Sequence, residues 1–357
     1  MPQERLPSLD GLRAISIILV LGSHLVFSIP NAANYYLVLG AFDGALGVRI
    51  FFVISGFIIT HLFLREEDAT GTISISRFYL RRFIRLYPVN LAFVAFLFFL
   101  TLSTSLTISN CQYLTALTYT KNLACSGWID GHLWSLAVEE QFYLAWPLAF
   151  FFLRDRGLYY VASFFIAIAP FSRAFEYLWG SRQFDLLTSN SDALMIGCLL
   201  ALLCSDRMGL VKAIVSWRPA LGRTLAALLM YLPIALSSRF LFAPLTVTTG
   251  PMLQAACAGY LLMSFVFMQQ GPVFLLLNSR LLRGIGLISY SLYIWQQPFL
   301  LSPPELFGPY MGWIAHFPQN LALSFGFATL SYLALERPLV ALRSRLHPSS
   351  PPRRIQC

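Results

Sequence analysis

Hydrophobic residues occur in long runs along the whole chain, and polar clusters, glycine and proline separate these runs. A run of about 17 to 20 residues, coiled as an α-helix, crosses a hydrocarbon core of roughly 30 Å. The pattern predicts ten membrane-spanning helices, at residues 13–29, 46–64, 81–103, 132–153, 157–172, 190–205, 222–238, 250–268, 284–302 and 319–336. We therefore expect an all-α fold, a polytopic helical bundle in a membrane.

Composition agrees with this fold class. Of the 357 residues, 57% are hydrophobic and 11% are charged, and the mean hydropathy is +0.66. Soluble domains carry roughly a quarter charged residues, so a soluble fold would leave too much apolar surface in water. The pattern predicts one transmembrane domain over residues 1–342 and a short basic tail over residues 343–357. No small-x-small cleavage site follows the first run, which argues against a signal peptide.

The distribution of basic residues predicts the orientation of the bundle, because cytoplasmic loops retain Lys and Arg. With the N-terminus placed inside, 20 of the 25 Lys and Arg residues fall on the cytoplasmic side of ten spans. Both termini are then expected in the cytoplasm, as in a multi-pass protein of the plasma membrane. The net charge of +9 follows from this topology, so nucleic acid is not an expected partner.

Two of the six cysteines, Cys111 and Cys125, share the longest outer loop, residues 104–131. They are able to form a disulfide if that loop faces an oxidising compartment. Two cysteines in one loop also arise by coincidence, and the spacing alone leaves both interpretations open.

The first span carries Arg13 and His24, which are 11 residues apart. At about 100° per residue this separation is close to three full turns, so the two side chains share a helix face, ~16 Å apart along the axis. His24 is then expected beyond the middle of the membrane. A membrane histidine often serves only as an interhelical hydrogen-bonding group. The functional alternative is a neutral imidazole that acts as a base, since ionisable groups within spans mark functional sites.

The fourth span opens with His132, Ser135 and Glu139, whose spacing places them on one helix face. A carboxylate inside a span is costly unless it is paired. A Ser-His-Glu triad is disfavoured, because groups along one helix face rarely reach one another in nucleophile geometry. We expect Glu139 to pair with His24, Arg49 or another buried polar group, either in catalysis or as a structural bridge.

The start of the third span is strongly basic, and its Arg82 and Arg85 lie one helical turn apart. Guanidinium groups at this spacing are suited to binding phosphates. The competing interpretation is a positive-inside anchor that contacts lipid head groups. Further candidate pocket residues lie at span ends or among small and aromatic residues: Asp10, Arg49, Ser55, Trp134, Asp192, Tyr290 and Gln296. The sequence has no metal-ligand spacing and no nucleotide-binding motif, so neither a metal nor a tightly bound cofactor is expected.

Together these motifs resemble integral-membrane acyltransferase family 3, which includes bacterial acetylases of O-antigen and exopolysaccharide and some macrolide acylases. The resemblance spans most of the chain. It rests on the motifs LDGLRA with His24 eleven residues beyond its arginine, GVRIFFVISGF, FYLRRFIRLYP, HLWSLAVEEQFYLAWP, SDALMIG and ISYSLYIWQQP. It implies that His24 takes the position of the family's essential histidine, and that Arg13, Arg82 and Arg85 take those of its essential arginines.

The resemblance also implies a reaction. A cytoplasmic acyl-CoA, acetyl-CoA in the common case, donates an acyl group to a sugar hydroxyl on the outer side of a bacterial cell membrane. The three arginines would hold the CoA phosphates. His24, with Glu139, would act as the base or as an acyl relay, and the sequence leaves both routes open.

The chain departs from the family pattern in two respects. Many relatives read WHWP where this chain has Trp295-Gln296-Gln297-Pro298, so no imidazole is expected there. Some relatives carry a C-terminal extracytoplasmic hydrolase-like domain. Because the chain stops about 20 residues after its last predicted span, we expect such a domain to be either absent or encoded as a separate protein.

Three function classes remain to be weighed. An acyltransferase acting on a glycan is favoured, and the same chemistry on a macrolide-like small molecule is the nearest alternative. A secondary transporter would also use buried ionisable residues but often shows inverted repeats, which this sequence lacks. A structural or lipid-sorting membrane protein, whose partners would be lipids alone, would not need a buried histidine and carboxylate.

Overall fold

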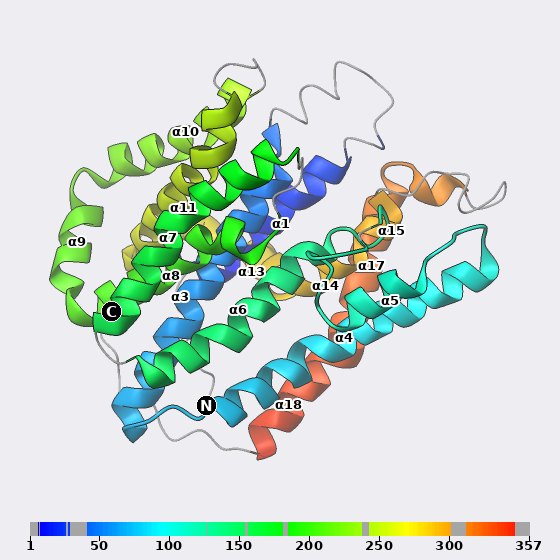
Figure 1. The fold of residues 1–357 in the computed structure, drawn as a ribbon, viewed down its shortest axis with the longest axis horizontal. Coiled ribbons are helices and arrows are strands. Elements are labelled where there is room, and N and C mark those ends of the chain that lie inside the picture. The colour runs from blue at the N-terminus through cyan, green and yellow to red at the C-terminus, as the bar shows by residue number, and fades with distance from the viewer. Residues whose placement is uncertain are drawn as a thin grey trace.

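The computed structural model describes residues 6, 8–25, 28, 41–125, 127–153, 156–180, 185–237, 243–300 and 312–346. Within these ranges the regular secondary structure is helical, as predicted (Figure 1). The long helices are α1 (Leu9–Leu25), α3 (Gly44–Thr70), α4 (Ile75–Ser103), α6 (Leu133–Phe152), α7 (Arg156–Leu178), α8 (Leu187–Asp206), α10 (Pro219–Ser237), α11 (Ala243–Phe267) and α17 (Gln319–Ser331).

Shorter helices connect and extend these elements. They are α5 (Asn110–Leu117), α9 (Met208–Ser216), α12 (Pro272–Leu277), α13 (Arg280–Leu287), α14 (Ser289–Trp295), α15 (Gln297–Leu300), the 3-10 helix η3 (Gly312–Ala315), the π-helix η4 (Tyr332–Glu336) and α18 (Arg337–Leu346). The predicted boundary between residues 342 and 343 falls inside α18, which continues to Leu346.

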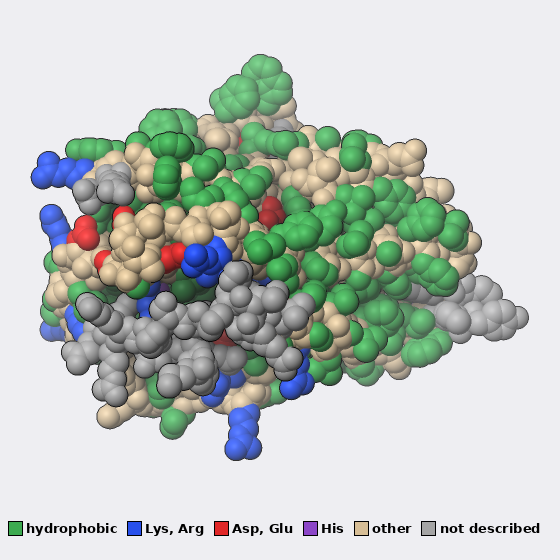
Figure 2. All heavy atoms as spheres, turned by 90° about the horizontal axis from the view of Figure 1, so that it is seen from below, with side chains coloured by type: hydrophobic (Ala, Val, Ile, Leu, Met, Phe, Trp, Pro, Cys, Tyr) green, Lys and Arg blue, Asp and Glu red, His purple; other side chains and the backbone are tan. Residues whose placement is uncertain are grey.

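Six of the described helices are long and apolar enough to cross a membrane, namely α3, α4, α7, α8, α10 and α11. The protein is therefore a multi-pass membrane protein. The other four predicted spans coincide with α1, with α6, with α13 to α15, and with α17 and η4. Figure 2 shows a largely hydrophobic face with Lys and Arg side chains gathered toward one end, an asymmetry typical of a bundle with one basic side.

The predicted ninth span, 284–302, is described as far as residue 300, and there it is divided into α13, α14 and α15 instead of forming one regular helix. Pro298 supplies a physical reason for the break after α14. Proline has no N–H group and so cannot bond to the carbonyl group four residues earlier, at Ile294. The side chain of His132 takes this position instead, with Nε2 3.1 Å from the Ile294 oxygen.

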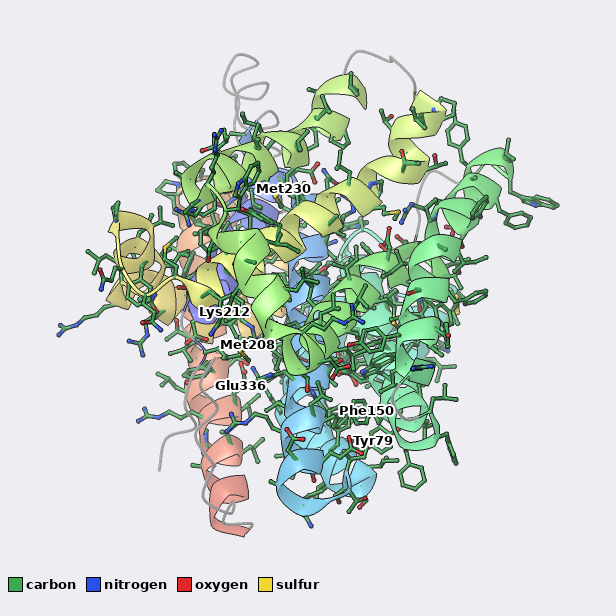
Figure 3. The ribbon with its side chains drawn as sticks, turned by 90° about the vertical axis from the view of Figure 1, so that its left-hand side faces the viewer. Tyr79, Phe150, Met208, Lys212, Met230 and Glu336 are labelled. Atoms are coloured by element: carbon green, nitrogen blue, oxygen red, sulfur yellow. A yellow bond between two sulfur atoms is a disulfide. The ribbon has the colours of Figure 1, made fainter. Side chains whose placement is uncertain are left out.

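The tenth predicted span, 319–336, also continues further than expected. It begins as α17, widens into the π-turn η4 and runs on as α18. Glu336, labelled in Figure 3, ends the π-turn and is only 3% exposed. Its carboxylate accepts a hydrogen bond of 2.5 Å from Ser291 Oγ of α14, which gives this buried acidic group a partner.

Helices α3 and α8 cross at very short range through glycine. A Cβ atom on Gly56 of α3 would collide with the Leu194 carbonyl group, and one on Gly197 of α8 would collide with that of Val53. Small residues allow helix backbones to approach in this way. The close helix packing expected beside Ser55 is therefore present.

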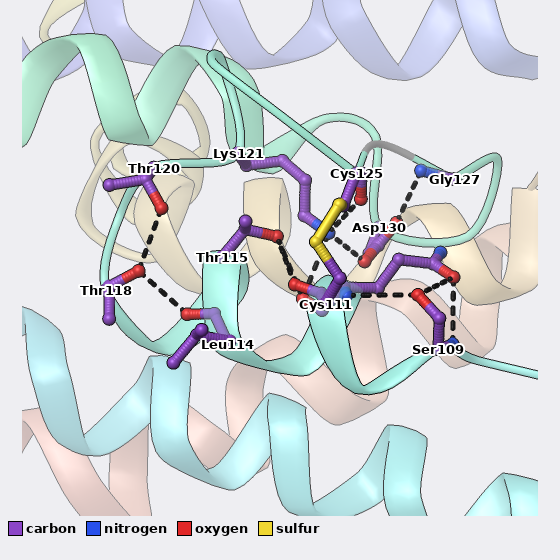
Figure 4. The surroundings of a disulfide bond; sticks show 11 residues. Ser109, Cys111, Leu114, Thr115, Thr118, Thr120, Lys121, Cys125, Gly127 and Asp130 are labelled. Atoms are coloured by element: carbon purple, nitrogen blue, oxygen red, sulfur yellow. Dashed lines mark hydrogen bonds and ion pairs between the residues drawn. A yellow bond between two sulfur atoms is a disulfide. The ribbon is translucent and has the colours of Figure 1, made fainter.

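A disulfide joins Cys111 of α5 to Cys125, so the pair that the sequence left open is bonded (Figure 4). The same loop holds a buried ion pair of 2.5 Å between Lys121 Nζ and Asp130 Oδ2. Lys121 also donates to the carbonyl oxygens of Gln112 and Cys125. Burial lowers the pKa of the Lys121 ammonium, and the hydrogen bond to Asp130 opposes that effect. These contacts fix the chain directly before α6.

Candidate active site

Five helices bring polar side chains to one pocket of about 70 Å³, which we call the polar pocket. Its polar and ionisable lining comes from α1, α3, α4, α6, α14 and the loop before α6. These residues are Arg13, Ser55, Arg85, Tyr119, Ser135, Glu139, Glu140, Tyr143, Ser289, Tyr290 and Tyr293. Such a concentration of polar groups inside an apolar bundle is the usual mark of a functional site.

Glu139 is paired within this pocket. Its carboxylate accepts hydrogen bonds from Ser55 Oγ of α3 and from the Tyr143 hydroxyl one turn further along α6. The expected pairing with another buried polar group is thus correct, whereas the two named candidates have other partners. His24 bonds to Gln296, and Arg49 Nη1 donates to Gln254 Oε1 at 2.6 Å.

The arginines lie at one side of the same pocket. Arg13 of α1 and Arg85 of α4 both line it and interact electrostatically with each other. The Arg82 guanidinium lies over the Tyr143 ring, 4.2 Å from its centroid. Two cations beside one small cavity repel each other, so an anion placed between them would be stabilised.

His24 lies in the last described turn of α1, which runs from Leu9 to Leu25. Residues 26, 27 and 29 of the predicted span lie outside the described residues. The Nδ1 atom of His24 is 2.6 Å from Gln296 Oε1. Because an amide oxygen only accepts, Nδ1 carries the hydrogen and donates it. Nε2 of the neutral ring then keeps its lone pair, which is the form that a base requires.

Tyr293 connects the polar pocket to the histidines. It lines the pocket, its hydroxyl lies 2.5 Å from Ser135 Oγ, and it donates to the His132 carbonyl oxygen at 3.0 Å. The Tyr293 and His132 rings are in contact, with centroids 5.5 Å apart. His132 in turn lies within electrostatic range of His24. Polar contacts therefore lead from the polar pocket through Tyr293 to His132.

The structure divides the predicted site residues into groups. The polar pocket collects those that the motifs placed on facing helices: Arg13, Ser55, Arg85, Ser135, Glu139 and Tyr290. Arg49 and Trp134 line a second, wider pocket. Asp192 lies in neither pocket and forms a buried ion pair of 2.8 Å with Arg173 Nη2. Asp10 lies at the tight contact between α1 and Gly286 of α13.

Several pocket residues were not predicted. Glu140 and Tyr143 stand beside Glu139 in the same motif, and the spacing of four residues between Glu139 and Tyr143 could have indicated their shared face. Tyr293 follows Tyr290 by three residues in the same way. Tyr119 comes from an irregular loop, where no periodicity points to a pocket.

A search for similar proteins gives a consistent result. The sequence model of a family described as an acyltransferase domain, acyltransferase family 3, matches residues 6–335. The chain belongs to this family. The match covers every residue of the polar pocket as well as His24 and Gln296.

Curated relatives carry related names. The chain is 28% identical to the peptidoglycan O-acetyltransferase OatA of Listeria monocytogenes, over 94% of its own length and 56% of that protein. It is 27% identical to the putative peptidoglycan O-acetyltransferase YrhL of Bacillus subtilis, over 94% and 55% respectively. It is also 27% identical to the O-acetyltransferase OatA of Staphylococcus aureus, over 94% and 57%.

The chain spans about half the length of the curated relatives it matches. No solved structure matches it.

Gln296 stands where the resemblance implied a histidine in many relatives, in a WHWP motif. In this protein the Gln296 side chain binds His24.

Proposed function

We infer that the protein is a membrane O-acyltransferase, which moves an acetyl group from cytoplasmic acetyl-CoA to a hydroxyl group of a cell-surface or exported glycan. The observation that carries this proposal is the hydrogen bond between His24 Nδ1 and Gln296 Oε1, which leaves Nε2 of a neutral ring able to accept a proton. Family membership and the names of the relatives support the same chemistry.

The proposed reaction is an acyl transfer. The acceptor hydroxyl oxygen attacks the thioester carbonyl carbon, a C–O bond forms and the C–S bond of acetyl-CoA breaks. His24 Nε2 takes the hydroxyl proton and returns it to the departing thiolate, which regenerates the neutral ring. In the second route His24 Nε2 attacks the thioester carbonyl carbon, so that a C–N bond forms, the C–S bond breaks and the CoA thiolate leaves. The hydroxyl oxygen then attacks the acetyl carbon, a C–O bond forms and the C–N bond breaks, and the hydroxyl proton passes through the regenerated ring to solvent. Rapid-quench labelling with radioactive acetyl-CoA separates the routes, because only the second leaves acetyl on the protein.

Arg13, Arg82 and Arg85 are proposed to hold the CoA phosphates. Arginine suits phosphate because its planar fork donates two parallel hydrogen bonds. The acyl arm would pass through the polar pocket toward Tyr293 and His24. The names of the relatives, which are O-acetyltransferases, favour acetyl as the acyl group.

The decisive experiment compares ester-linked acetyl groups on cell-surface glycans between the wild type and His24→Ala at equal membrane levels of protein. Loss of a general base lowers rates by roughly 10² to 10⁴, so acetylation should nearly disappear. His316→Ala, at an exposed histidine, is the matched control. Unchanged acetylation in the His24 variant would refute the mechanism. If a secreted small molecule loses an acyl ester while glycans carry none, the acceptor class is wrong and the chemistry stands.

A second experiment tests the donor site. Arg85→Gln should weaken binding of acetyl-CoA to the purified protein, because it removes a cation from the polar pocket. Arg77→Gln is the matched control, since Arg77 lies exposed near the start of the same helix. Equal affinities of the two variants for acetyl-CoA would show that Arg85 does not bind the donor and serves only as a positive-inside anchor.

A further inference from the structure

The second cavity, which we call the wide pocket, has a volume of about 590 Å³ and lies where α3, α6, α8 and α11 begin. Its polar lining includes Asp43, Arg49, Trp134, Arg173, Asp185 and Gln254. This volume is within the range of about 300 to 1,000 Å³ that is typical of small-molecule sites. The reaction proposed above gives this cavity no role.

The charges in the wide pocket favour a neutral ligand with many hydroxyl groups. Arg173 already donates to Thr248, Ser189 and Asp192 through all three of its nitrogens. Arg49 is bound to Gln254. Both cations are therefore engaged, and two carboxylates, those of Asp43 and Asp185, face the same space. A strongly anionic ligand would meet two cations that already have partners and two carboxylates that repel it.

The Asp185 carboxylate is the acceptor in the wide pocket that is best placed to bind a ligand. No described residue donates a hydrogen bond to its carboxylate or forms an ion pair with it, although the side chain is only partly exposed. A carboxylate in this setting is a strong acceptor for hydroxyl groups. Asp43 caps α3 through one oxygen, which bonds to the Leu46 N–H at 2.7 Å, and its second oxygen adds another acceptor.

Trp134 provides a flat apolar surface in the same cavity. Its ring is held edge-on by Phe52, with centroids 6.3 Å apart. A large aromatic ring flanked by hydrogen-bond acceptors matches a sugar ring, which has an apolar C–H face and a rim of hydroxyl groups.

The wide pocket adjoins the candidate active site. Val48 lines both cavities, and Phe52 of the polar pocket touches Trp134 of the wide pocket. Next to Asp43, a Cβ atom on Gly44 would collide with Ser23 Oγ, the neighbour of His24 in α1. A ligand in the wide pocket thus lies one layer of side chains from the groups assigned to chemistry.

We propose that the wide pocket binds a neutral sugar ring of the glycan acceptor, with Trp134 as the stacking surface and Asp43 and Asp185 as acceptors for its hydroxyl groups. This proposal rests on the proposed function for its link to acyl transfer. To the proposed function it adds the binding site of the acceptor and the chemical class of the sugar that binds there.

The test uses the detergent-solubilised full chain and a soluble tetrasaccharide of β-1,4-linked N-acetylglucosamine. Saturation-transfer NMR measures binding without acetyl-CoA, and acetyl transfer from labelled acetyl-CoA gives kcat and KM. Trp134→Ala should raise the KM for the tetrasaccharide roughly tenfold, the scale of one aromatic stacking contact, and leave the KM for acetyl-CoA within about twofold. Trp134→Phe, which keeps an aromatic ring, should recover most of the affinity, and Asp185→Ala should also weaken binding.

Trp217→Ala, at an exposed tryptophan beside α9, is the matched control and should bind as the wild type does. If the wild type acetylates the tetrasaccharide and Trp134→Ala and Asp185→Ala leave its KM unchanged, the subsite is refuted while the proposed function stands. If the tetrasaccharide binds the wild type but not Trp134→Ala, and no acetyl transfer occurs, the subsite stands and the proposed function fails. Absence of binding to the wild type refutes the subsite.

Discussion

At the scale of single residues, the contact between His24 and Gln296 determines which ring nitrogen is able to take a proton. The sequence singled out both residues but not their contact, because 272 positions separate them and only the folded bundle joins them. Ser55 and Glu139 show the same limit. Their motifs indicated buried polar groups, whereas the choice of partner depended on which faces of α3 and α6 meet.

We predict that Gln296→Leu lowers the rate of acetyl transfer about fivefold, since one net hydrogen bond is worth roughly 1 kcal/mol and its loss lets the ring change tautomer and turn. Gln296→Glu keeps the acceptor oxygen and should retain more activity. Steady-state kinetics on purified protein measures both, with Gln270→Leu at an exposed position as the control. Full activity of Gln296→Leu would show that this contact does not set the protonation of His24.

Asp185 predicts a pH dependence of stability. Burial raises the pKa of its carboxyl group to about 6, from an ordinary value of 3.8. Between these values the folded protein binds a proton that the unfolded chain has released, so stability falls as pH rises through this window. Asp185→Asn, which stays neutral, should therefore melt close to the wild type near pH 4 and at a higher temperature at pH 7.5. Thermal unfolding in detergent measures the difference, with exposed Asp68→Asn as the control. A difference that does not change with pH would contradict the prediction.

At the scale of elements, the hydrophobic runs correctly predicted where the long helices lie. They did not predict where a helix is interrupted, because an interruption depends on backbone groups that bond to residues of another segment. The break at α14 and α15 depends on His132, which approaches the Ile294 carbonyl from another helix. The short helices α5, α9 and α12 were also not predicted, because they are too short to give a run that spans a membrane.

The crossing of α3 and α8 predicts a sharp sensitivity to side-chain size. Gly56→Ala would place a methyl group against the Leu194 carbonyl, which belongs to the backbone and cannot turn away. We expect a loss of stability of about 1 to 3 kcal/mol, the usual range for overpacking. Gly209→Ala in α9 has open space around it and is the matched control. Thermal unfolding of the two variants makes the comparison, and equal midpoints would show that the helices are free to separate.

At the scale of the whole molecule, the disulfide and the basic residues point to the same orientation. We predict that the loop before α6 lies outside the cell, because the Cys111–Cys125 bond is stable in an oxidising compartment. We predict that the start of α4 and the segment around α9 lie inside, because cytoplasmic segments retain arginine. Because the disulfide and the basic residues agree, we keep the prediction of ten membrane crossings with both termini in the cytoplasm.

Two engineered cysteines test this topology in intact cells. Ser105→Cys, in the loop after α4, should react with a membrane-impermeant maleimide. Ser216→Cys, at the end of α9, should react only after the membrane is opened. Both serines are exposed, so accessibility on the protein itself is matched. The reverse labelling pattern would invert the bundle and place Arg13, Arg82 and Arg85 away from cytoplasmic acyl-CoA.

The π-turn at Tyr332–Glu336 has a consequence for how the chain tolerates changes of length. A π-turn holds one residue more than the matching α-helical stretch. Deletion of one of the residues before Glu336 would therefore allow a regular helix while α18 keeps its orientation and Glu336 stays beside Ser291. The same deletion within α17 or α18 would turn the helix beyond it by roughly 100°, so homologous chains should lose a residue within the turn more readily than within the regular helices on either side.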